Sequence, residues 1–435
     1  MLKVWAVFFL MYAVLPFHVV DRQLTIQGFF LLFLFILAFC VGTLGIQPAR
    51  RRAAICPPRE IDFSTTDTVL TAASVVTIVA MLLELWGKNV FDLAASYDLR
   101  SDQAAALMEG AASSSTIWFQ IGFLTYPAGY AYLVRGIIFD SKLDPRRLLF
   151  FGFVPVLLAT VSMGGRSPLL YAILISFFSF GTRRFYLHRL NPTPRGARPP
   201  VRTRGLGLMK NLGIAAIVLG AMYYFVAVFL TRAESLGGAA GMFQVAERIW
   251  GISFSGPVAT FMFQMLGDEF TYIIFVFNWY VVQGLVMANF LFSDYTGPMQ
   301  WGVYGVDLVS ALVRRINGDL VARNFDSLQQ VGVYGFLPSA FGSLYVDLWF
   351  FGLLIAAAWG LLASLVYKKV RAGRDARWLL LAPLMTSGVL FSFINTPLGF
   401  ANGLVTHFWI LLAFLSSCRL RSARRTRLPV APQAD

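Results

Sequence analysis

The chain has 435 residues, of which 57% are hydrophobic and 13% charged, and its mean hydropathy is +0.67. A soluble protein cannot bury that much apolar surface, whereas segments of about 17–25 apolar residues separated by charged loops are typical of membrane-spanning helices. The apolar runs lack the alternation of a β-barrel, so we predict an all-α polytopic membrane protein.

The formal net charge is +14, but the basic residues cluster in short loops beside the apolar segments. This pattern indicates cytoplasmic loops under the positive-inside rule and argues against a nucleic-acid partner. The three cysteines, Cys40, Cys56 and Cys418, form no pair with metal-ligand spacing, and none falls in a predicted outer loop. We therefore expect neither a disulfide framework nor a zinc site.

The apolar segments predict about twelve transmembrane helices, the first of which lacks the cleavage site of a signal peptide. The eighth and ninth segments either cross as a pair or re-enter and pack over a cavity, so the count is twelve or ten, with both termini inside. In chain order the segments are Val4–Val20, Gln27–Gly45, Val69–Trp86, Ile117–Ile138, Leu148–Val161, Pro168–Thr182, Leu212–Leu230, Ile249–Leu266, Tyr272–Phe292, Gly342–Val366, Trp378–Phe393 and Leu398–Ser416.

We predict a single membrane domain, residues 1–435, whose loops differ in charge and in the side of the membrane that they face. Residues 183–210 carry eight Lys and Arg, no acid and a proline- and glycine-rich run, which predicts a flexible cytoplasmic loop. Residues 419–435 form a second basic cytoplasmic segment. Residues 293–341 are expected to form the main periplasmic loop, in which Val306–Val313 suggests a surface helix.

A set of arginines falls on the outer side, against the positive-inside rule. Planar guanidinium groups suit a phosphate or diphosphate ligand, although acids in the same regions make an ion pair an equal explanation for any single arginine. The set is Arg100, Arg166, Arg232, Arg248, Arg314, Arg315 and Arg323.

Arg166 stands out because it follows Gly164 and Gly165 between two apolar segments. The glycines permit a tight bend and close approach of a ligand to backbone N–H groups. Pro168 suits the start of the next helix, and a helix N-terminus is itself an anion site. The alternative is an interfacial arginine that snorkels at a helix end.

Two other regions offer candidate residues. The run from Asp294 to Tyr304 mixes aromatic, glycine and polar residues, which suits stacking on sugar rings but is also normal at a membrane interface. Asp268 and Glu269 lie between two apolar pieces, where a carboxylate could take a hydroxyl proton, or could pair with Arg232 or Arg248. No nucleotide, metal-ligand or serine-nucleophile motif is present.

The segment Gly164-Gly165-Arg166-x-x-Leu169-Leu170 resembles the Gly-x-Arg signature of bacterial O-antigen polymerases of the Wzy type. The run from Leu337 to Gly352, which includes Tyr345, is similar to the family's stretch after the large outer loop. Arg100 and Arg248 are also placed as in that family.

The resemblance implies a metal-independent, cofactor-free GT-C-like membrane glycosyltransferase of the bacterial inner membrane, with its active site facing the periplasm. A growing glycan moves from undecaprenyl diphosphate to the non-reducing sugar of another lipid-linked repeat unit. Expected partners are that lipid-linked oligosaccharide, membrane lipids, a chain-length regulator and a flippase. The candidate catalytic residues are Arg166, Arg248, Arg315 and Glu269, and the candidate substrate-binding residues are Arg100, Arg232, Arg314, Arg323, Tyr304 and Tyr345.

Two other functions fit the same features. An O-antigen ligase, which moves finished polymer to lipid A-core, is likewise a multi-span protein with an arginine-bearing outer loop. A flippase or transporter of lipid-linked oligosaccharide needs charged residues at mid-membrane depth, and the predicted spans are nearly free of charge there.

Overall fold

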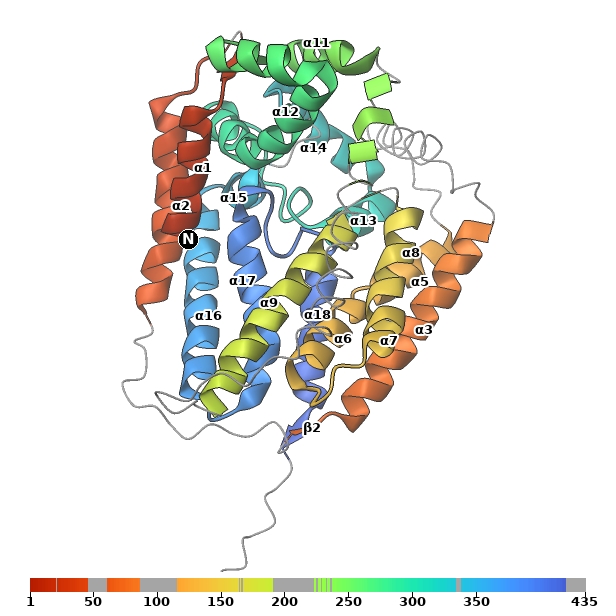
Figure 1. Cartoon of the computed structure of the whole chain (residues 1–435). Coiled ribbons are helices and arrows are strands. Elements are labelled where there is room, and N and C mark those ends of the chain that lie inside the picture. Colours follow the sequence, from red (N-terminus) through yellow and green to blue (C-terminus); the bar gives the residue numbers. More distant parts are fainter. Residues whose placement is uncertain are drawn as a thin grey trace, which may run out of the picture.

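The computed structural model describes residues 1–20, 22–45, 61–86, 116–163, 165, 167–190, 237–333 and 338–419, and a few residues between 223 and 234 (Figure 1). These residues are mostly helical and include two small two-stranded sheets. The elements are α1 (Leu2–Val14), β1 (Phe17–Val19), α2 (Ile26–Leu44), β2 (Ile61–Asp62), α3 (Ser64–Trp86), α5 (Ile117–Thr125), α6 (Ala128–Phe139), α7 (Pro145–Arg147), η2 (Leu148–Phe153), α8 (Val154–Ser162), α9 (Ser167–Leu190), α11 (Gly238–Trp250), β3 (Ile252–Phe254), α12 (Pro257–Asp294), α13 (Asp307–Ile316), α14 (Gly318–Gln330), α15 (Ser339–Leu348), η3 (Trp349–Phe351), α16 (Gly352–Ala372), η4 (Ala376–Leu380), α17 (Leu381–Leu390), η5 (Phe391–Phe393), α18 (Gly403–Ser416) and β4 (Cys418–Arg419).

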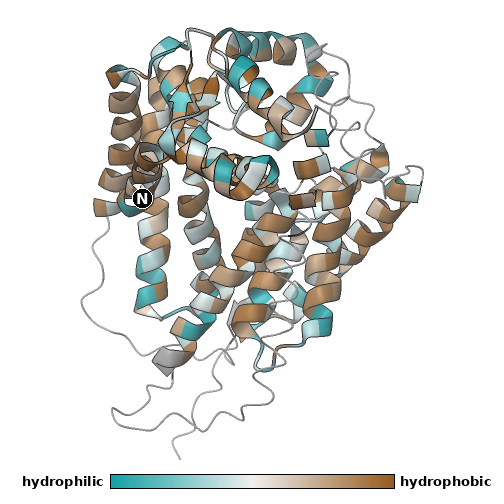
Figure 2. Ribbon diagram, turned by 45° about the horizontal axis from the view of Figure 1, so that its top comes forward, coloured by the Kyte–Doolittle hydropathy of each residue, from teal (hydrophilic) through white to brown (hydrophobic). Residues whose placement is uncertain are grey.

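Six helical stretches among the described residues are long and apolar enough to cross a membrane, and α1 and α18 are apolar but shorter. Hydrophobic residues dominate these helices in Figure 2. The architecture therefore agrees with the predicted α-helical membrane class. The six stretches are Ile26–Leu44, Ser64–Trp86, Pro145–Ser162, Pro257–Asp294, Ser339–Ala372 and Ala376–Phe393.

Several boundaries differ from the predicted segments. The first helix ends at Val14, and its 13 residues extend about 20 Å, because the chain then enters β1. The predicted fourth span is divided at Pro127 into α5 and α6. The helix that follows Pro338 breaks at Trp349, whose φ is +49°. The predicted seventh span, Leu212–Leu230, lies largely outside the described residues.

The two apolar pieces at 249–292 belong largely to one helix, α12, which kinks at Gly267 (φ +74°). Its start, Gly256, lies beside His18, since a Cβ there would be 3.8 Å from the histidine ring. Its end, Asp294, pairs with Arg22. Both ends of α12 therefore contact the short segment 17–22, so the helix starts and finishes at the same end of the bundle (Figure 1).

The opposite end of the bundle gathers basic residues, and we call it the basic end, defined by Arg135, Arg183 and Arg377. Arg183 donates to the carbonyl oxygens of Ile137 and Asp140, both at 2.7 Å. These bonds hold α9 against α6 just after the predicted end of the sixth span, Thr182, and α9 continues for about two more turns to Leu190. The strands β2 and β4 also pair at this end.

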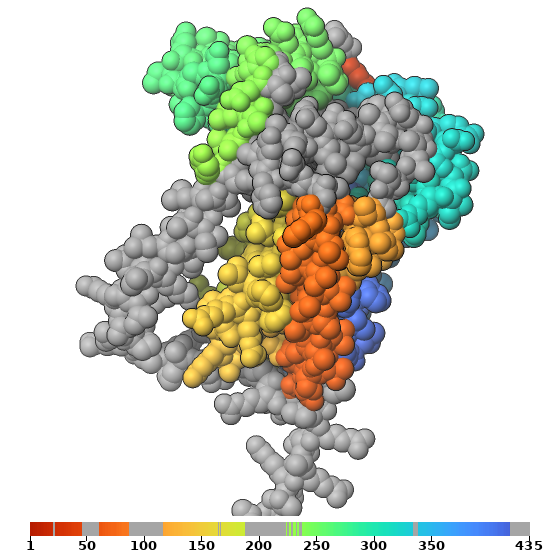
Figure 3. Space-filling model, turned by 90° about the vertical axis from the view of Figure 1, so that its right-hand side faces the viewer, coloured from red at the N-terminus to blue at the C-terminus, as the bar shows by residue number. Residues whose placement is uncertain are grey.

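The helices pack around two hydrophobic clusters. One is built mainly by α1, α2, α12, α15 and α16, and the other by α3, α5 to α9, α17 and α18. In the first, Gly42 and Gly360 bring α2 and α16 so close that a Cβ at either would lie within 2.0 Å of a carbonyl oxygen of the other helix. Small residues at such crossings let membrane helices approach closely. Figure 3 shows α3 at the surface of the second cluster.

Candidate functional site

Two irregular segments, residues 295–306 and 391–402, lie against each other where the hydrophobic clusters meet. Phe393 packs against both clusters. The Thr396 hydroxyl donates to the carbonyl oxygen of Gly305 at 3.0 Å. A Cβ at Gly399 would lie only 2.0 Å from that same oxygen. Non-helical backbone is tolerated at membrane depth only where protein or an aqueous cavity satisfies its polar groups, and these contacts provide part of that satisfaction.

The buried carboxylate of Asp347 holds the 295–306 segment in place. It accepts backbone N–H bonds from Tyr304 at 3.0 Å and Gly305 at 2.8 Å, and its own carbonyl oxygen accepts from the Trp301 N–H at 2.9 Å. The side chain is only 3% exposed. A buried carboxylate that accepts several backbone bonds fixes its surroundings, so Asp347 sets the point at which the chain enters α13.

The 391–402 segment ends at Asn402, which adopts left-handed backbone angles (φ +57°). The Asn402 side chain donates to the carbonyl oxygen of Phe123 at 2.7 Å, while its own Oδ1 is buried without a hydrogen-bond partner in the described structure. The Tyr126 hydroxyl donates to the carbonyl oxygen of Ala401 at 3.0 Å. These bonds fix the orientation of the peptide between Ala401 and Asn402, which faces α13.

Asp307, the first residue of α13, faces this peptide. The residue keeps contact with solvent, yet the protein packed around its carboxyl group removes part of the hydration of the charged form and raises the pKa to about 6. A hydrogen bond from the Asn402 backbone N–H acts in the opposite direction and lowers the pKa. Tyr126 lies within electrostatic reach of the same carboxylate. An accessible carboxyl group with a pKa close to neutral is suited to accept a proton from a substrate hydroxyl.

Arg314 lies two turns further along α13. Its Nε is buried without a hydrogen-bond partner in the described structure, and burial, followed by the charge of neighbouring Arg315, lowers the pKa of its guanidinium. The ion pairs between described residues include neither arginine. Arg314 is half-buried and Arg315 is exposed, and guanidinium groups of this kind suit an anionic ligand such as a phosphate.

Two tyrosines connect this site to the start of α9. The ring of Tyr126 contacts that of Tyr130 edge-on at 5.7 Å, and the Tyr130 hydroxyl donates to the carbonyl oxygen of Pro168 at 3.0 Å. Pro168 is the second residue of α9, two positions after Arg166 in the sequence. Arg166 and Gly164 themselves lie outside the described residues, as do Arg100 and Arg232.

The remaining charged candidates are separate from α13. Arg248 is exposed in the last turn of α11, and Glu269 is exposed just after the kink of α12. Arg323 is exposed on α14, where its Nε donates to the carbonyl oxygen of Asp319 at 3.3 Å. Of the predicted charged residues, the described structure brings together only Arg314 and Arg315.

The two candidate tyrosines occupy different environments. Tyr304 is half-buried and is tied to Asp347 through its backbone, so it belongs to the wall of the site. Tyr345 is 5% exposed and packs against the rings of Phe292 and Trp349 at 4.9 and 5.6 Å. Its position fits a packing role better than contact with a sugar.

Sequence reasoning did not single out Asp307, Asp347 or the 391–402 segment. A signal for the segment was present, because Phe393-Ile-Asn-Thr-Pro-Leu-Gly-Phe-Ala-Asn402 places amides, a proline and a glycine between apolar runs. A signal for Asp347 was a single carboxylate within a predicted span, which by default marks function. Asp307 carried no local signal, since its partner Asn402 is 95 positions away.

Comparison with known proteins assigns no family. No protein-family model, no curated protein and no solved structure matches the chain. Within the described residues, no group of three or more His, Cys, Asp or Glu side chains could hold a metal ion. The site is therefore characterised by its carboxylate, its arginine pair and the two irregular segments that position them.

Proposed function

We propose that the chain is a polysaccharide polymerase of a bacterial inner membrane, which transfers a growing glycan from undecaprenyl diphosphate to the non-reducing sugar of another lipid-linked repeat unit. The observation that carries this proposal is that one short helix, α13, holds both a carboxyl group of raised pKa and an arginine, Arg314, whose Nε is buried without a hydrogen-bond partner in the described structure. The resemblance of the Gly164–Leu170 stretch to Wzy-type polymerases supports the same substrate class.

The spacing on α13 suits this transfer. Seven residues correspond to almost two full turns, so Asp307 and Arg314 lie on one face of the helix, with their backbones about 10 Å apart. Their side chains can reach toward each other along that face. An acceptor hydroxyl beside Asp307 and a diphosphate beside Arg314 would then flank an anomeric carbon between them.

In the proposed reaction, the acceptor hydroxyl attacks the anomeric carbon of the glycan carried by the donor lipid. The new glycosidic C–O bond forms as the C–O bond to the diphosphate breaks. The hydroxyl proton passes to the Asp307 carboxylate, and undecaprenyl diphosphate leaves with the bonding electron pair. Arg314 and Arg315 stabilise the charge that develops on the diphosphate.

Orientation and topology form part of the proposal. The positive-inside rule puts the basic end in the cytoplasm, and α13 then faces the periplasm. Because both ends of α12 contact the segment 17–22, we favour ten crossings over twelve, in a GT-C-like architecture with both termini cytoplasmic. A chain-length regulator and a flippase of the same pathway are the expected protein partners.

The test is complementation of a strain that lacks its own copy of the gene, followed by gel analysis of lipopolysaccharide. Asp307→Asn and Arg314→Ala should each leave core plus a single repeat unit, with normal protein levels in the membrane. Asp326→Asn and Arg323→Ala change exposed residues of the neighbouring helix α14 and should keep the full ladder.

The gel also separates the proposed polymerase from its rivals, because loss of a ligase or of a flippase would leave bare core when Asp307 is replaced. The two rivals differ in where lipid-linked units accumulate: a ligase defect leaves finished polymer on its lipid in the periplasm, and a flippase defect leaves single repeat units on the cytoplasmic side. A full ladder from the Asp307→Asn variant would contradict the proposed role of α13.

A further inference from the structure

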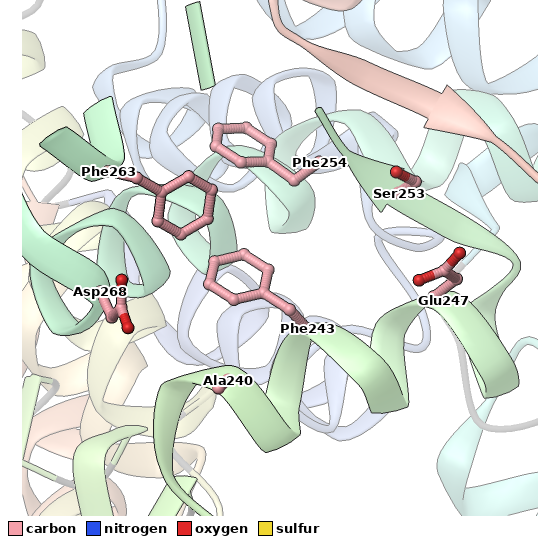
Figure 4. Close-up of a pocket in the computed structure, with 7 residues that line it drawn as sticks. All are labelled: Ala240, Phe243, Glu247, Ser253, Phe254, Phe263 and Asp268. Carbon is pink, nitrogen blue, oxygen red and sulfur yellow. The ribbon is translucent and has the colours of Figure 1, made fainter. Parts of the chain in front are cut away.

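A second concave site lies at the end of the molecule away from the basic end, between α11, β3 and the first part of α12 (Figure 4). Its volume is about 280 Å³, and the described residues that line it are Ala240, Phe243, Glu247, Ser253, Phe254, Phe263 and Asp268. No residue proposed for the transfer reaction belongs to this set. We call it the aromatic recess.

Backbone turns and strand pairing build the recess. Glycines with positive φ stand at the turns around it, including Gly251 (+63°), Gly256 (+100°) and Gly267 (+74°). β3, which forms one wall, pairs with β1, so that Ser253 lies opposite His18. The shape is therefore fixed by the backbone of three elements rather than by side chains alone.

Three phenylalanine rings form the floor. The ring of Phe243 is nearly parallel to that of Phe254, at 6.2 Å and 18°, and meets the ring of Phe263 at 5.2 Å and 69°. Beneath them Phe275 contacts both Phe243, at 5.1 Å, and Phe254, at 5.4 Å. This packing supports the floor from below and holds its rings in place.

Polar groups flank the aromatic floor on two sides. In Figure 4 the Glu247 carboxylate and the Ser253 hydroxyl lie at one side, and the Asp268 carboxylate lies at the other. The ion pairs between described residues include neither carboxylate, and the described lining contains no cationic side chain. The recess therefore presents hydrogen-bond acceptors around an apolar surface and would repel an anion.

We propose that the aromatic recess binds one non-anionic sugar residue of a glycan chain. A sugar ring offers an apolar C–H face for the phenylalanines and hydroxyl donors for the two carboxylates. The volume of about 280 Å³ lies just below the range of drug-sized ligand sites, roughly 300–1,000 Å³, and so fits one sugar rather than a lipid or a nucleotide. The inference rests on the proposed function for the source of the glycan, which is the polymer held between successive transfers.

The test measures binding without turnover, on purified full-length protein in detergent, by saturation-transfer NMR. The probes are maltohexaose and chitohexaose as neutral chains, hexagalacturonate as an anionic chain, and spermidine as a cation without a sugar ring. We expect millimolar binding of at least one neutral chain and none of hexagalacturonate. Binding of spermidine alone, of hexagalacturonate equally well, or of no neutral chain would overturn the proposal.

Matched variants locate the binding. The double change Glu247→Gln with Asp268→Asn, and separately Phe243→Leu, should each weaken binding at least five-fold. Asp326→Asn removes an exposed carboxylate of α14 outside the recess and should leave binding unchanged. Equal binding by the recess variants and the wild type would place the sugar elsewhere and reject the inference.

The proposed reaction at α13 and the proposed sugar site in the aromatic recess can be rejected independently of each other. Asp307→Asn should bind the neutral chain normally while making no polymer, and the recess variants should make polymer of shortened modal length. Sugar binding that persists while Asp307→Asn still yields a full ladder would remove the proposed reaction but keep the recess. Loss of polymer in Asp307→Asn, together with wild-type polymer length and wild-type sugar binding in the recess variants, would keep the proposed reaction and reject the recess as a sugar site.

Discussion

The carboxylate of Asp347 accepts a hydrogen bond of 2.8 Å from the backbone N–H of Gly305, two residues before Asp307. A residue of a helix deep in the bundle thereby fixes the loop that delivers the proposed base. The stability of this contact and the activity of the site should therefore be linked.

Replacing Asp347 with asparagine should destabilise the protein. The amide can keep one acceptor, but its NH2 group would face a backbone N–H that now bonds to a carboxylate oxygen. Leaving one buried donor unsatisfied costs about 1–3 kcal/mol. Thermal unfolding in detergent should show a lower midpoint for Asp347→Asn than for Ser343→Ala, which loses a hydroxyl bonded to Asn395. Equal midpoints would contradict the role of Asp347.

A methyl group at Gly399 should disrupt the contact between the two irregular segments, because its Cβ would lie 2.0 Å from the Gly305 carbonyl oxygen. Backbone must shift to relieve that overlap, so we expect Gly399→Ala to lower both the unfolding midpoint and polymer formation. The control is Gly181→Ala in α9, where a Cβ meets nothing within 4 Å and helix propensity should add about 0.5–1 kcal/mol of stability. Similar behaviour of the two variants would argue against the close approach.

Polymerisation should depend on pH through Asp307. The base must be ionised, and burial raises the pKa of its carboxyl to about 6, so the rate should rise between pH 5 and 7 with a midpoint near 6. A reconstituted assay with lipid-linked repeat units would measure this. A profile flat across that interval would exclude Asp307 as the base.

The same shift has a consequence for stability. The pKa of the Asp307 carboxyl in the folded state lies above the ordinary value of 3.8, so protonation of this group favours the folded state. Its contribution to the free energy of unfolding is fully present below pH 3.8 and is lost as the pH rises through about 6. Asp307→Asn should therefore gain stability relative to the wild type at pH 8 but not at pH 4. Chemical denaturation at the two pH values measures the difference, and a gain of equal size at both would contradict the expected linkage.

The arginine pair should act on the diphosphate. Losing charged hydrogen bonds of about 1.5–3 kcal/mol corresponds to roughly 10- to 100-fold weaker binding. We expect Arg314→Ala to raise the inhibition constant of undecaprenyl diphosphate by that factor, and Arg314→Lys to recover only part of it, since an ammonium group lacks the planar fork. Arg323→Ala should leave the constant unchanged. An unaltered constant in Arg314→Ala would move the diphosphate away from α13.

The fold class was predictable because apolar runs of membrane length dominate the composition, and the runs became helices. Whether each apolar run forms one unbroken helix was not predictable. Pro127, Trp349 and the 391–402 segment interrupt predicted spans, and in the 391–402 segment buried polar contacts with distant residues satisfy backbone and side-chain groups. α12 kept its apolar length yet returned to the segment 17–22, which no local pattern reveals.

The site was only partly predictable for the same reason. Arg314 and Arg315 belong to the arginine set that the sequence singled out, and they are adjacent on a helix that the run Val306–Val313 suggested. Asp307 gains its raised pKa from burial and its orientation from Asn402, which lies far away in the sequence. Glu269, chosen as the carboxylate because it follows an apolar piece, lies exposed on α12.

The most direct measurement is a cryo-electron microscopy map of the Asp307→Asn variant with a lipid-linked repeat unit whose diphosphate carries a non-hydrolysable methylene bridge. The account predicts the diphosphate within hydrogen-bond distance of Arg314 and the anomeric carbon between that arginine and position 307. A diphosphate bound at Arg248 or elsewhere, with α13 free of substrate, would contradict it.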